Sequence, residues 1–334
     1  MEGVALYYIL ISVLAVLTGI FAVLYILERG RRKDIKDRTQ KEADRLREQM
    51  AQNAGIFERF FPKNLPELLG IRRVKDITMN LQRSFIASVM SVRVLNYDHA
   101  IHTMASDKMF MVINRIFSRL IPVVVQSGGI IDRFDKAGMT GLYAEDSEQA
   151  LKAAVSLCVQ VDDLGESQNY GEFAVGLDHG EVIIGVVGHE QRISSVTMSE
   201  SVNISVVLQK IAGKYGARIL VTEAFVDHVP GFAKNYNSRV LGYFYDSTQD
   251  RAIKVYDVYD GDIAERKQSK RKTRMIFEQG IEFYIHGDYK EARLHFVEVL
   301  KADRYDLAAK EYLYMCDMLC NERIGEVEIC IERF

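Results

Sequence analysis

The chain has 334 residues, of which 48% are hydrophobic and only four are proline, so most of it is expected to fold and to bury a core. Its formal net charge of −3 excludes the class of proteins that attract nucleic acid through a basic face. The four cysteines (Cys158, Cys316, Cys320 and Cys330) form no C-x-x-C pair and have no histidine cluster beside them, which predicts buried thiols without a metal.

Residues 3–27 contain no charged side chain, and a helix of that length crosses the roughly 30 Å hydrocarbon core of a bilayer. A cleaved signal peptide is disfavoured because the apolar run is too long and lacks both a basic start and a small-residue cleavage site. The basic stretch ERGRRKDIKDR follows directly. By the positive-inside rule this order predicts a single-pass inner (plasma) membrane protein with its N-terminus outside and the bulk of the chain in the cytoplasm.

Residues 28–57 are charged and helical in pattern. Their apolar residues recur at a spacing of three or four, and these are Ala43, Leu46, Met50, Ala54 and Phe57. A seam this narrow favours a two-helix coiled-coil stalk between paired chains. A single solvated helix is the alternative, because no heptad pattern is sustained.

Residues 58–260 alternate between strand and helix patterns, which predicts an α+β sandwich. Apolar, β-rich runs predict strands, and amphipathic runs predict helices. The expected elements are a strand over 84–92, a helix over 106–129, a hairpin of 130–134 and 139–144, a helix over 147–161, two strands within 172–188 joined by a turn at Asp178-His179-Gly180, a helix over 201–216 and a strand over 217–225.

Four segments of this domain, in order, resemble the catalytic domain of class III adenylate/guanylate cyclases. They are FERFFPKNLPELLG (57–70), GGIIDRF (128–134), GLDHGEVIIGVVGHEQR (176–192) and SVNISVVLQKIAGKYGARILVTE (201–223). The resemblance covers about residues 57–259. It implies the ferredoxin-like sandwich of the class III nucleotidyl cyclases.

The resemblance also implies metal-dependent catalysis, but some residues that this catalysis needs are missing from the chain. Family members hold two divalent cations with two aspartates, because such cations prefer carboxylate oxygens. Here Ser91 and Ala137 stand at those positions, so no metal and no cofactor are expected. Asp135 lies two residues before Ala137 and is the one carboxylate that a shifted turn would bring to a cation; an exposed turn residue is the favoured interpretation.

The other half of the family's site is also incomplete. Asn203 matches the family's asparagine, but Val207 stands where an arginine stabilises charge on the phosphate. Arg133 aligns with the purine-selecting lysine and Val196 with the second selecting residue, while no lysine lies near Asp246-Ser247. Arg133 and Asn203 therefore remain as a nucleotide-binding remnant. The two histidines His179 and His189 are predicted to be polar turn residues.

Residues 261–273 form a basic segment that predicts a solvated linker, with contact to anionic lipid as the alternative. Residues 274–334 resemble a tetratricopeptide (TPR) repeat, with Gly280, Phe283, Ala292 and Phe296 at its small and aromatic positions and a turn at Gly287-Asp288-Tyr289. A single repeat does not usually stand alone. The tail is therefore expected to pack on the cyclase-like domain, on its copy in a dimer, or on a partner.

Three functions follow from these features. The first is a membrane-anchored, catalytically inactive scaffold or signalling adaptor that forms a homodimer or heterodimer and binds a protein partner through its tail. The second is a regulatory or weakly active half of a cyclase that makes cAMP or cGMP. The third is a structural subunit of an inner-membrane secretion or motility machine.

Overall fold

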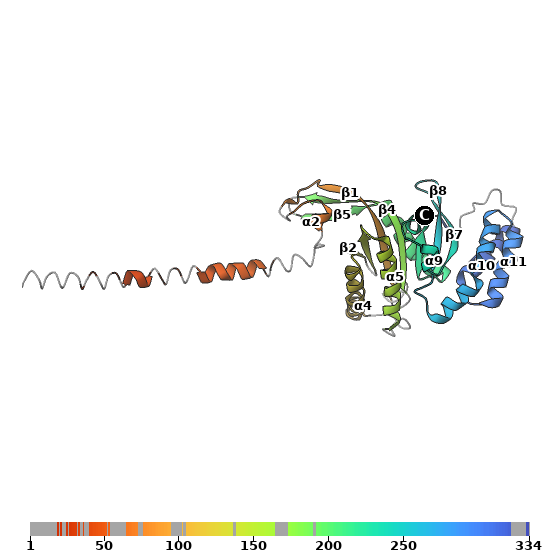
Figure 1. The fold of residues 1–334 in the computed structure, drawn as a ribbon, viewed down its shortest axis with the longest axis horizontal. Helices are drawn as coiled ribbons and strands as arrows, with labels where there is room; N and C mark the ends of the chain where they lie inside the picture. Colours follow the sequence, from red (N-terminus) through yellow and green to blue (C-terminus); the bar gives the residue numbers. More distant parts are fainter. Residues whose placement is uncertain are drawn as a thin grey trace, which may run out of the picture. The chain divides into compact units, whose positions relative to one another are not determined.

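The computed structural model divides into two compact units, Met1–Lys63 and Asn64–Phe334 (Figure 1). In the first unit the structure describes helical residues 27–31 and 40–51, together with residues 19, 21, 25, 33, 36 and 53. In the second it describes residues 65–72, 76–94, 102, 105–135, 138–163, 173–189, 192–321 and 332–333. The predicted membrane span over 3–27 and much of the stalk lie outside the described residues, and so does Ala137.

The second unit is built on a mixed sheet with the strand order β2-β3-β1-β4-β6-β8-β7-β9, in which β5 pairs with β4. The strands are β1 (Gln82–Val94), β2 (Ile130–Asp135), β3 (Gly138–Tyr143), β4 (Phe173–His189), β5 (Arg192–Met198), β6 (Ile219–Thr222), β7 (Ser238–Asp246), β8 (Arg251–Val258) and β9 (Glu332–Arg333). Two pairs, β4–β6 and β7–β9, are parallel, and the other pairs are antiparallel. The predicted α+β architecture is confirmed.

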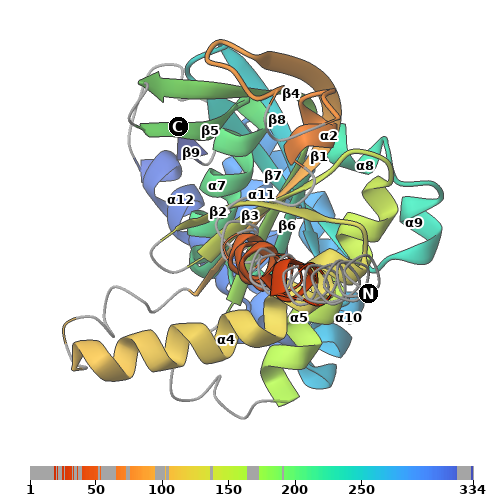
Figure 2. The ribbon, with the colours of Figure 1, turned by 90° about the vertical axis from the view of Figure 1, so that its left-hand side faces the viewer.

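Helices cover both faces of this sheet (Figure 2). The helices are α2 (Leu65–Leu68), α4 (Ser106–Gln126), α5 (Ser147–Asp163), α7 (Glu200–Ile211), the short 3₁₀ helix η2 (Ala212–Tyr215), α8 (Glu223–Val226), α9 (Phe232–Asn235), α10 (Ala264–Ile285), α11 (Tyr289–Ala302) and α12 (Leu307–Asn321). On one face, α4 and α5 pack on a core that includes Val175 and Ile219. On the other face, α7 packs on a core that includes their neighbours Ala174 and Leu220. Successive strand residues thus supply the two cores alternately.

The turn predicted at Asp178-His179-Gly180 does not exist. β4 runs unbroken through these residues and pairs with β1 from Phe173 to Gly185. The glycines that suggested a turn serve a close approach of α7 instead. A Cβ on Gly176 would lie 2.1 Å from the Ser205 carbonyl oxygen, and one on Gly180 would lie 2.5 Å from the Ser201 hydroxyl. Glycine in a strand interior marks such a backbone approach as often as a bend.

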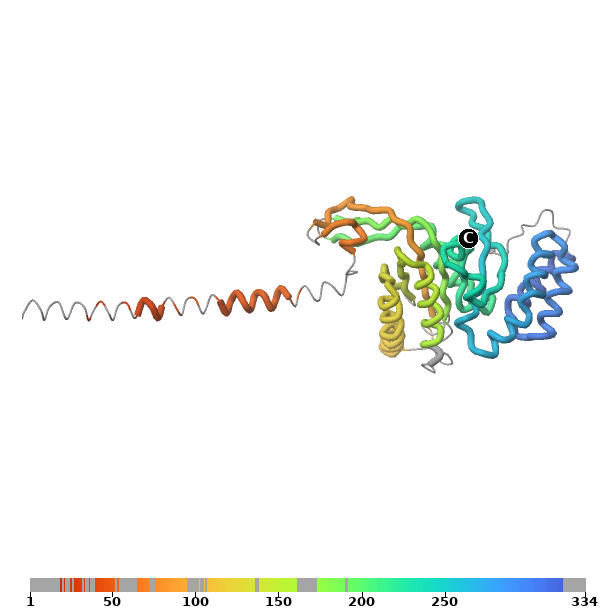
Figure 3. Tube along the Cα trace, viewed as in Figure 1, coloured from red at the N-terminus to blue at the C-terminus, as the bar shows by residue number. Residues whose placement is uncertain are grey.

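The C-terminal helices α10, α11 and α12 pack on the sheet through β7, at the end of the chain trace coloured blue in Figure 3. Their core is continuous with the core under α7: Phe277, Phe296 and Tyr312 of the tail belong to the same cluster as Leu241 and Phe244 of β7. Of the three contacts expected for the tail, packing on the cyclase-like domain is the one present in this single chain. The TPR assignment itself stays a prediction.

Details of the helical hairpin follow the sequence pattern. Gly280 lies against the Phe296 ring, where an added Cβ would be 2.9 Å from the ring, and Gly287 takes a left-handed conformation at the turn (φ +79°). The predicted linker over 261–273 differs from the structure, because its residues from Ala264 onward form the first half of α10. Lys270, in the middle of that segment, is buried.

The cysteines and the apolar helix α4 bear on two further predictions. Cys158 and Cys316 are buried as predicted, but Cys320 is exposed, and Cys330 lies outside the described residues. Among the described helices, residues Asp107–Gln126 of α4 are long and apolar enough to cross a membrane by length and composition. That helix also buries Ile116, Leu120 and Val124 in the core.

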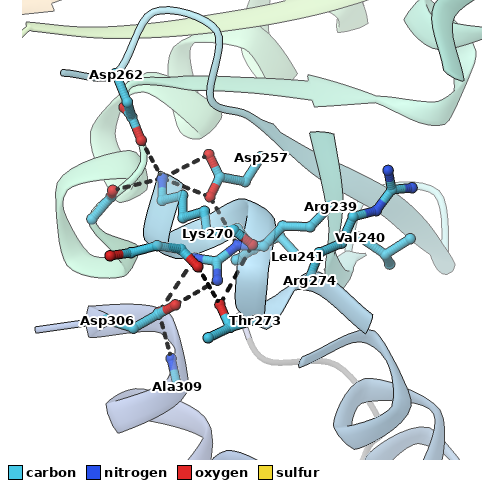
Figure 4. A network of polar contacts seen from close by, with 12 residues as sticks. Arg239, Val240, Leu241, Asp257, Asp262, Lys270, Thr273, Arg274, Asp306 and Ala309 are labelled. Atoms are coloured by element: carbon cyan, nitrogen blue, oxygen red, sulfur yellow. Dashed lines mark hydrogen bonds and ion pairs between the residues drawn. The ribbon is translucent and has the colours of Figure 1, made fainter. Parts of the chain in front are cut away.

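A fully buried network of charges joins the tail to the sheet (Figure 4). Arg239 of β7 contacts Asp257 of β8 (Nε–Oδ2 3.1 Å) and Asp306 before α12 (Nη2–Oδ1 3.3 Å). Its guanidinium also lies 4.2 Å from the centre of the Phe277 ring. Lys270 of α10 contacts Asp257 (Nζ–Oδ2 2.9 Å) and Asp262 (Nζ–Oδ2 2.8 Å). Each buried cation thus has two carboxylate partners.

Within the network, Arg239 and Asp306 hold each other in their charged forms against the cost of burial. Burial acts to lower the pKa of Arg239, but the charges of Asp306 and Asp257 outweigh it and raise that pKa above its ordinary value. For Asp306 burial acts to raise the pKa, and Arg239 outweighs it, so the pKa of this carboxyl is lowered. Both charges are therefore present at neutral pH, and each depends on the other.

We expect Asp306→Asn to lower the free energy of unfolding by about 3 kcal/mol, because it leaves a buried guanidinium with only one of its two partner charges, Asp257. Asparagine retains the side-chain oxygen that accepts a bond from the Ala309 N–H, so the change removes little besides charge. Urea denaturation measures the effect. The control is Glu298→Gln, which breaks an exposed pair with Lys301 (56% and 66% exposed) and should cost less than about 1 kcal/mol. Equal losses in the two variants would contradict the assigned role of the network.

Candidate functional site

Ser91, at the first of the two metal-ligand positions, lies in β1 with its side chain beneath α7. It is fully buried, opposite Thr140 of β3 and Gly176 of β4. Its Oγ is 2.9 Å from Ser205 Oγ of α7 and 3.5 Å from Thr140 Oγ1. This hydroxyl cluster joins β1, β3 and α7. A hydroxyl here is satisfied inside the protein and offers no anion.

The second metal-ligand position, Ala137, falls outside the described residues, but its flanks are placed. Asp135 is exposed at the end of β2. Gly138 opens β3 so close to β1 that an added Cβ would lie 2.0 Å from the Val92 carbonyl oxygen. The pairing of β2, β3 and β1 therefore brings Asp135 and Gly138 to the end of β1 that contains Ser91.

Helix α7 carries the remaining positions. Its N-cap is Ser199, whose hydroxyl accepts a hydrogen bond from the Ser201 N–H at 3.1 Å. Asn203 is exposed and Val207 is half-buried on the first turns of the helix. A valine has no charge with which to stabilise a phosphate.

Arg133 of β2 is held by two neighbours. Its Nε contacts Asp132 Oδ2 at 3.0 Å, and its Nη2 donates to the Thr197 carbonyl oxygen at 3.3 Å. The Thr197 hydroxyl also donates to Asp132. The structure thus brings the two predicted purine-selecting positions together, because Thr197 directly follows Val196 in β5.

An open cleft of about 680 Å³ lies beside the amino end of α7, over β4, α8 and β8. Its charged lining is mostly acidic and includes Asp178, Glu181, Glu200, Glu223 and Asp227, with Arg251 and Lys254 as bases. Arg251 pairs with Glu200 at 2.6 Å, and Lys254 pairs with Glu223 at 3.6 Å. Sequence patterns do not reveal this cleft, because its residues come from five separate segments.

His179 lines the cleft and lies in β4, not in a turn as predicted; His189 ends the same strand. The His179 Nδ1 is 2.9 Å from Ser88 Oγ, and its ring stacks on the His228 ring with 3.7 Å between centroids. Burial, with a further contribution from His228, lowers the pKa of His179 to about 4. The ring is therefore neutral at physiological pH.

Asp178 precedes His179 in β4 and is buried. It accepts a hydrogen bond from the Thr222 hydroxyl. Burial raises the pKa of this carboxyl, and the bonds from Thr222 and Ser201 only partly offset the rise. The residues that the structure describes contain no group of three or more His, Cys, Asp or Glu side chains that would hold a metal ion.

The lowered pKa of His179 makes the free energy of unfolding depend on pH. The folded protein holds the pKa of His179 near 4, below the ordinary 6.5, so the unfolded chain binds more protons between these pH values. The free energy of unfolding should therefore fall as pH is lowered from about 6.5 to about 4. We expect His179→Gln to flatten this slope in urea titrations. His286→Gln, at an exposed histidine of the tail, is the control and should leave the slope unchanged; a slope that survives in His179→Gln would assign it elsewhere.

The chain is similar to known proteins both in sequence and in fold. No protein-family model matches the chain. An adenylate cyclase of Dictyostelium discoideum, described as terminal-differentiation specific, is 21% identical over 272 residues, which cover 78% of this chain and 13% of that protein. An adenylate cyclase of Anabaena cylindrica is 21% identical over 213 residues, which cover 60% of this chain and 42% of the relative. The chain thus spans less than half the length of either relative.

The fold is also similar to that of an adenylyl cyclase. The solved structure of a bacterial light-regulated adenylyl cyclase superposes with a TM-score of 0.57 at 17% identity, covering 68% of each chain. At this identity the match concerns the fold alone, and it agrees with the segments that carry the resemblance in the sequence. The chain therefore contains a class III adenylyl/guanylyl cyclase-like domain.

Proposed function

We propose that this protein is a membrane-anchored, catalytically inactive cyclase-like protein that acts as a scaffold or signalling adaptor. The observation that carries the proposal is Ser91: at the first metal-ligand position the chain places a fully buried hydroxyl that is bonded to Ser205. Hard divalent cations are held mainly by anionic carboxylates and need room for about six or more oxygen ligands, waters included. A hydroxyl enclosed by other hydroxyls meets neither condition.

The sequence supports the same conclusion at two more positions. Ala137 replaces the second carboxylate and Val207 replaces the arginine. Removing a single preorganised charge-stabilising donor from an enzyme typically costs about 10²–10³ in rate, and here three groups are missing together. Residual cyclisation at a useful rate is not expected.

The adaptor role rests on the parts that remain. The stalk helix exposes Leu46 and Met50 (56% and 69%), which suits pairing with the stalk of a second copy, and the cyclase-like domain offers a further dimer contact. The helices of the tail, which is TPR-like in sequence, present Leu294 and Tyr314 to solvent for a protein partner. The apolar run over 3–27 would anchor the assembly with its N-terminus outside and these surfaces in the cytoplasm.

The second candidate, a regulatory half of a cyclase, is favoured by one observation. Arg133 and Asn203 are both exposed, and the Arg133 guanidinium already reaches β5. Such a half would contact a purine nucleotide whose metals and phosphate-stabilising groups come from another chain. It requires a catalytic partner that carries the missing carboxylates.

We expect the full-length protein in detergent or nanodiscs to convert neither ATP nor GTP to a cyclic nucleotide above a buffer control, with Mg²⁺ or with Mn²⁺. Product detection by mass spectrometry measures this, with an active class III cyclase as the positive control. Isothermal calorimetry of the same samples tests metal-dependent binding. Turnover by the protein alone would overturn the proposal.

A restoration experiment separates the two candidates. Val207→Arg returns the missing cation on a half-buried helix position. In a scaffold it should create no nucleotide binding, because Ser91 and Ala137 still leave the metals without ligands. Binding of ATP or GTP that appears in Val207→Arg and is lost again in Val207→Arg with Asn203→Ala would favour the regulatory half.

A further inference from the structure

The outward surface of α4 is divided lengthwise into an apolar strip and a basic strip. The inward side of the helix is accounted for by the core, which takes Met109, Ile116, Leu120 and Val124. Figure 2 shows α4 at the outside of the unit, with its Ser106 end extending beyond the neighbouring elements. No function assigned above uses this outer side.

The apolar strip contains three strongly exposed side chains. Phe110 is 69% exposed, Met111 63% and Val125 55%. Phe117 continues the strip to the sheet, because its ring lies 5.2 Å from that of Phe134 on the edge strand β2. Phe134 is itself 55% exposed. Phe117 and Phe134 thus connect the exposed apolar side chains of the helix with the edge of the sheet.

The basic strip contains Lys108, Arg115 and Arg119, which are all exposed. Their spacing of seven and four residues places them on one side of the helix. Asp107 is the acidic residue of α4, so the helix carries three positive charges and one negative charge. The bases lie beside the exposed apolar side chains, among which Asp107, Asn114 and Ser118 are also exposed.

We propose that this face of α4 docks on an anionic lipid surface. Apolar and aromatic side chains on one side of a helix with lysine and arginine beside them are the features of helices that lie in the plane of a membrane interface. Anionic headgroups attract each such base. The α4 segment passes the length and hydropathy test for a span (mean hydropathy 1.4 over Asp107–Gln126), but its inward side is held by the core, so it contacts the bilayer from the surface.

Two other occupants are less well matched to this face. A second copy of α4 would bring another three bases to the contact, and like charges oppose such an interface. A soluble partner would need acidic groups along one strip and an apolar ridge along the other. A bilayer that contains anionic lipid supplies both features at once, over any length of helix.

The chain has no tryptophan, which makes a single-tryptophan experiment clean. Phe110→Trp places the probe on the apolar strip, and Tyr305→Trp places it at an aromatic of the tail that is equally exposed (69% for both native residues). Each full-length variant is reconstituted in vesicles of phosphatidylcholine alone or with phosphatidylglycerol. Brominated acyl chains then quench only a tryptophan that enters the bilayer.

The expected result is strong quenching of the tryptophan at 110 in phosphatidylglycerol vesicles, weak quenching in phosphatidylcholine, and none at 305 in either. Adding Arg115→Gln and Arg119→Gln should weaken docking about 30-fold, since each base at an anionic surface contributes roughly a fivefold factor. The matched control, Lys290→Gln with Lys301→Gln on the exposed side of α11, should leave the quenching unchanged.

Three outcomes overturn the proposal. The first is a tryptophan at 110 that is no more quenched than the one at 305. The second is quenching that is the same in both lipids, since the bases would then have no role. The third is protection of the tryptophan at 110 from aqueous iodide that rises with protein concentration in the absence of lipid, which would show a second copy on this face. None of these outcomes depends on whether the domain turns over nucleotide.

Discussion

The buried contact between Arg239 and its two carboxylates is the interaction on which the rest of the second unit depends. It joins β7, β8 and the segment before α12 at a point that water does not reach. Burying a charge is unfavourable unless partners satisfy it, so the guanidinium is tolerated only while the sheet and the tail are together. Lys270 and its carboxylates extend this dependence to α10. The tail is consequently part of the domain's fold and not an appendage.

The same continuity reaches the candidate site through α7. One side of this helix faces the hydroxyl cluster around Ser91, and its apolar residues Ile204 and Leu208 share a core with Phe277 and Tyr312 of the tail. The helix can lie so close to β4 only because Gly176 has no side chain. The helix that carries Asn203 and the tail are therefore joined by one continuous set of packed side chains.

The contacts of Ser91 show how a neutral side chain is accommodated beneath α7. A carboxylate beneath α7 would need a cation or strong donors to offset its burial, whereas serine is satisfied by Ser205 and Thr140. The hydroxyl cluster stabilises the packing of α7 on β1 without any ion.

The sequence by itself determined the α+β class and the order of most elements, because apolar periodicity is a local property. It also indicated Gly280 and Gly287 correctly, since a helical hairpin sets both from short-range geometry. It failed where a residue's role depends on a distant segment. The glycines of β4 predicted a turn but serve α7, the basic run over 264–273 predicted a linker but contains a buried lysine, and His179 was assigned to a turn although it stacks on His228. Only the tertiary structure decided these, because each contact joins residues dozens of positions apart whose pairing no local pattern encodes.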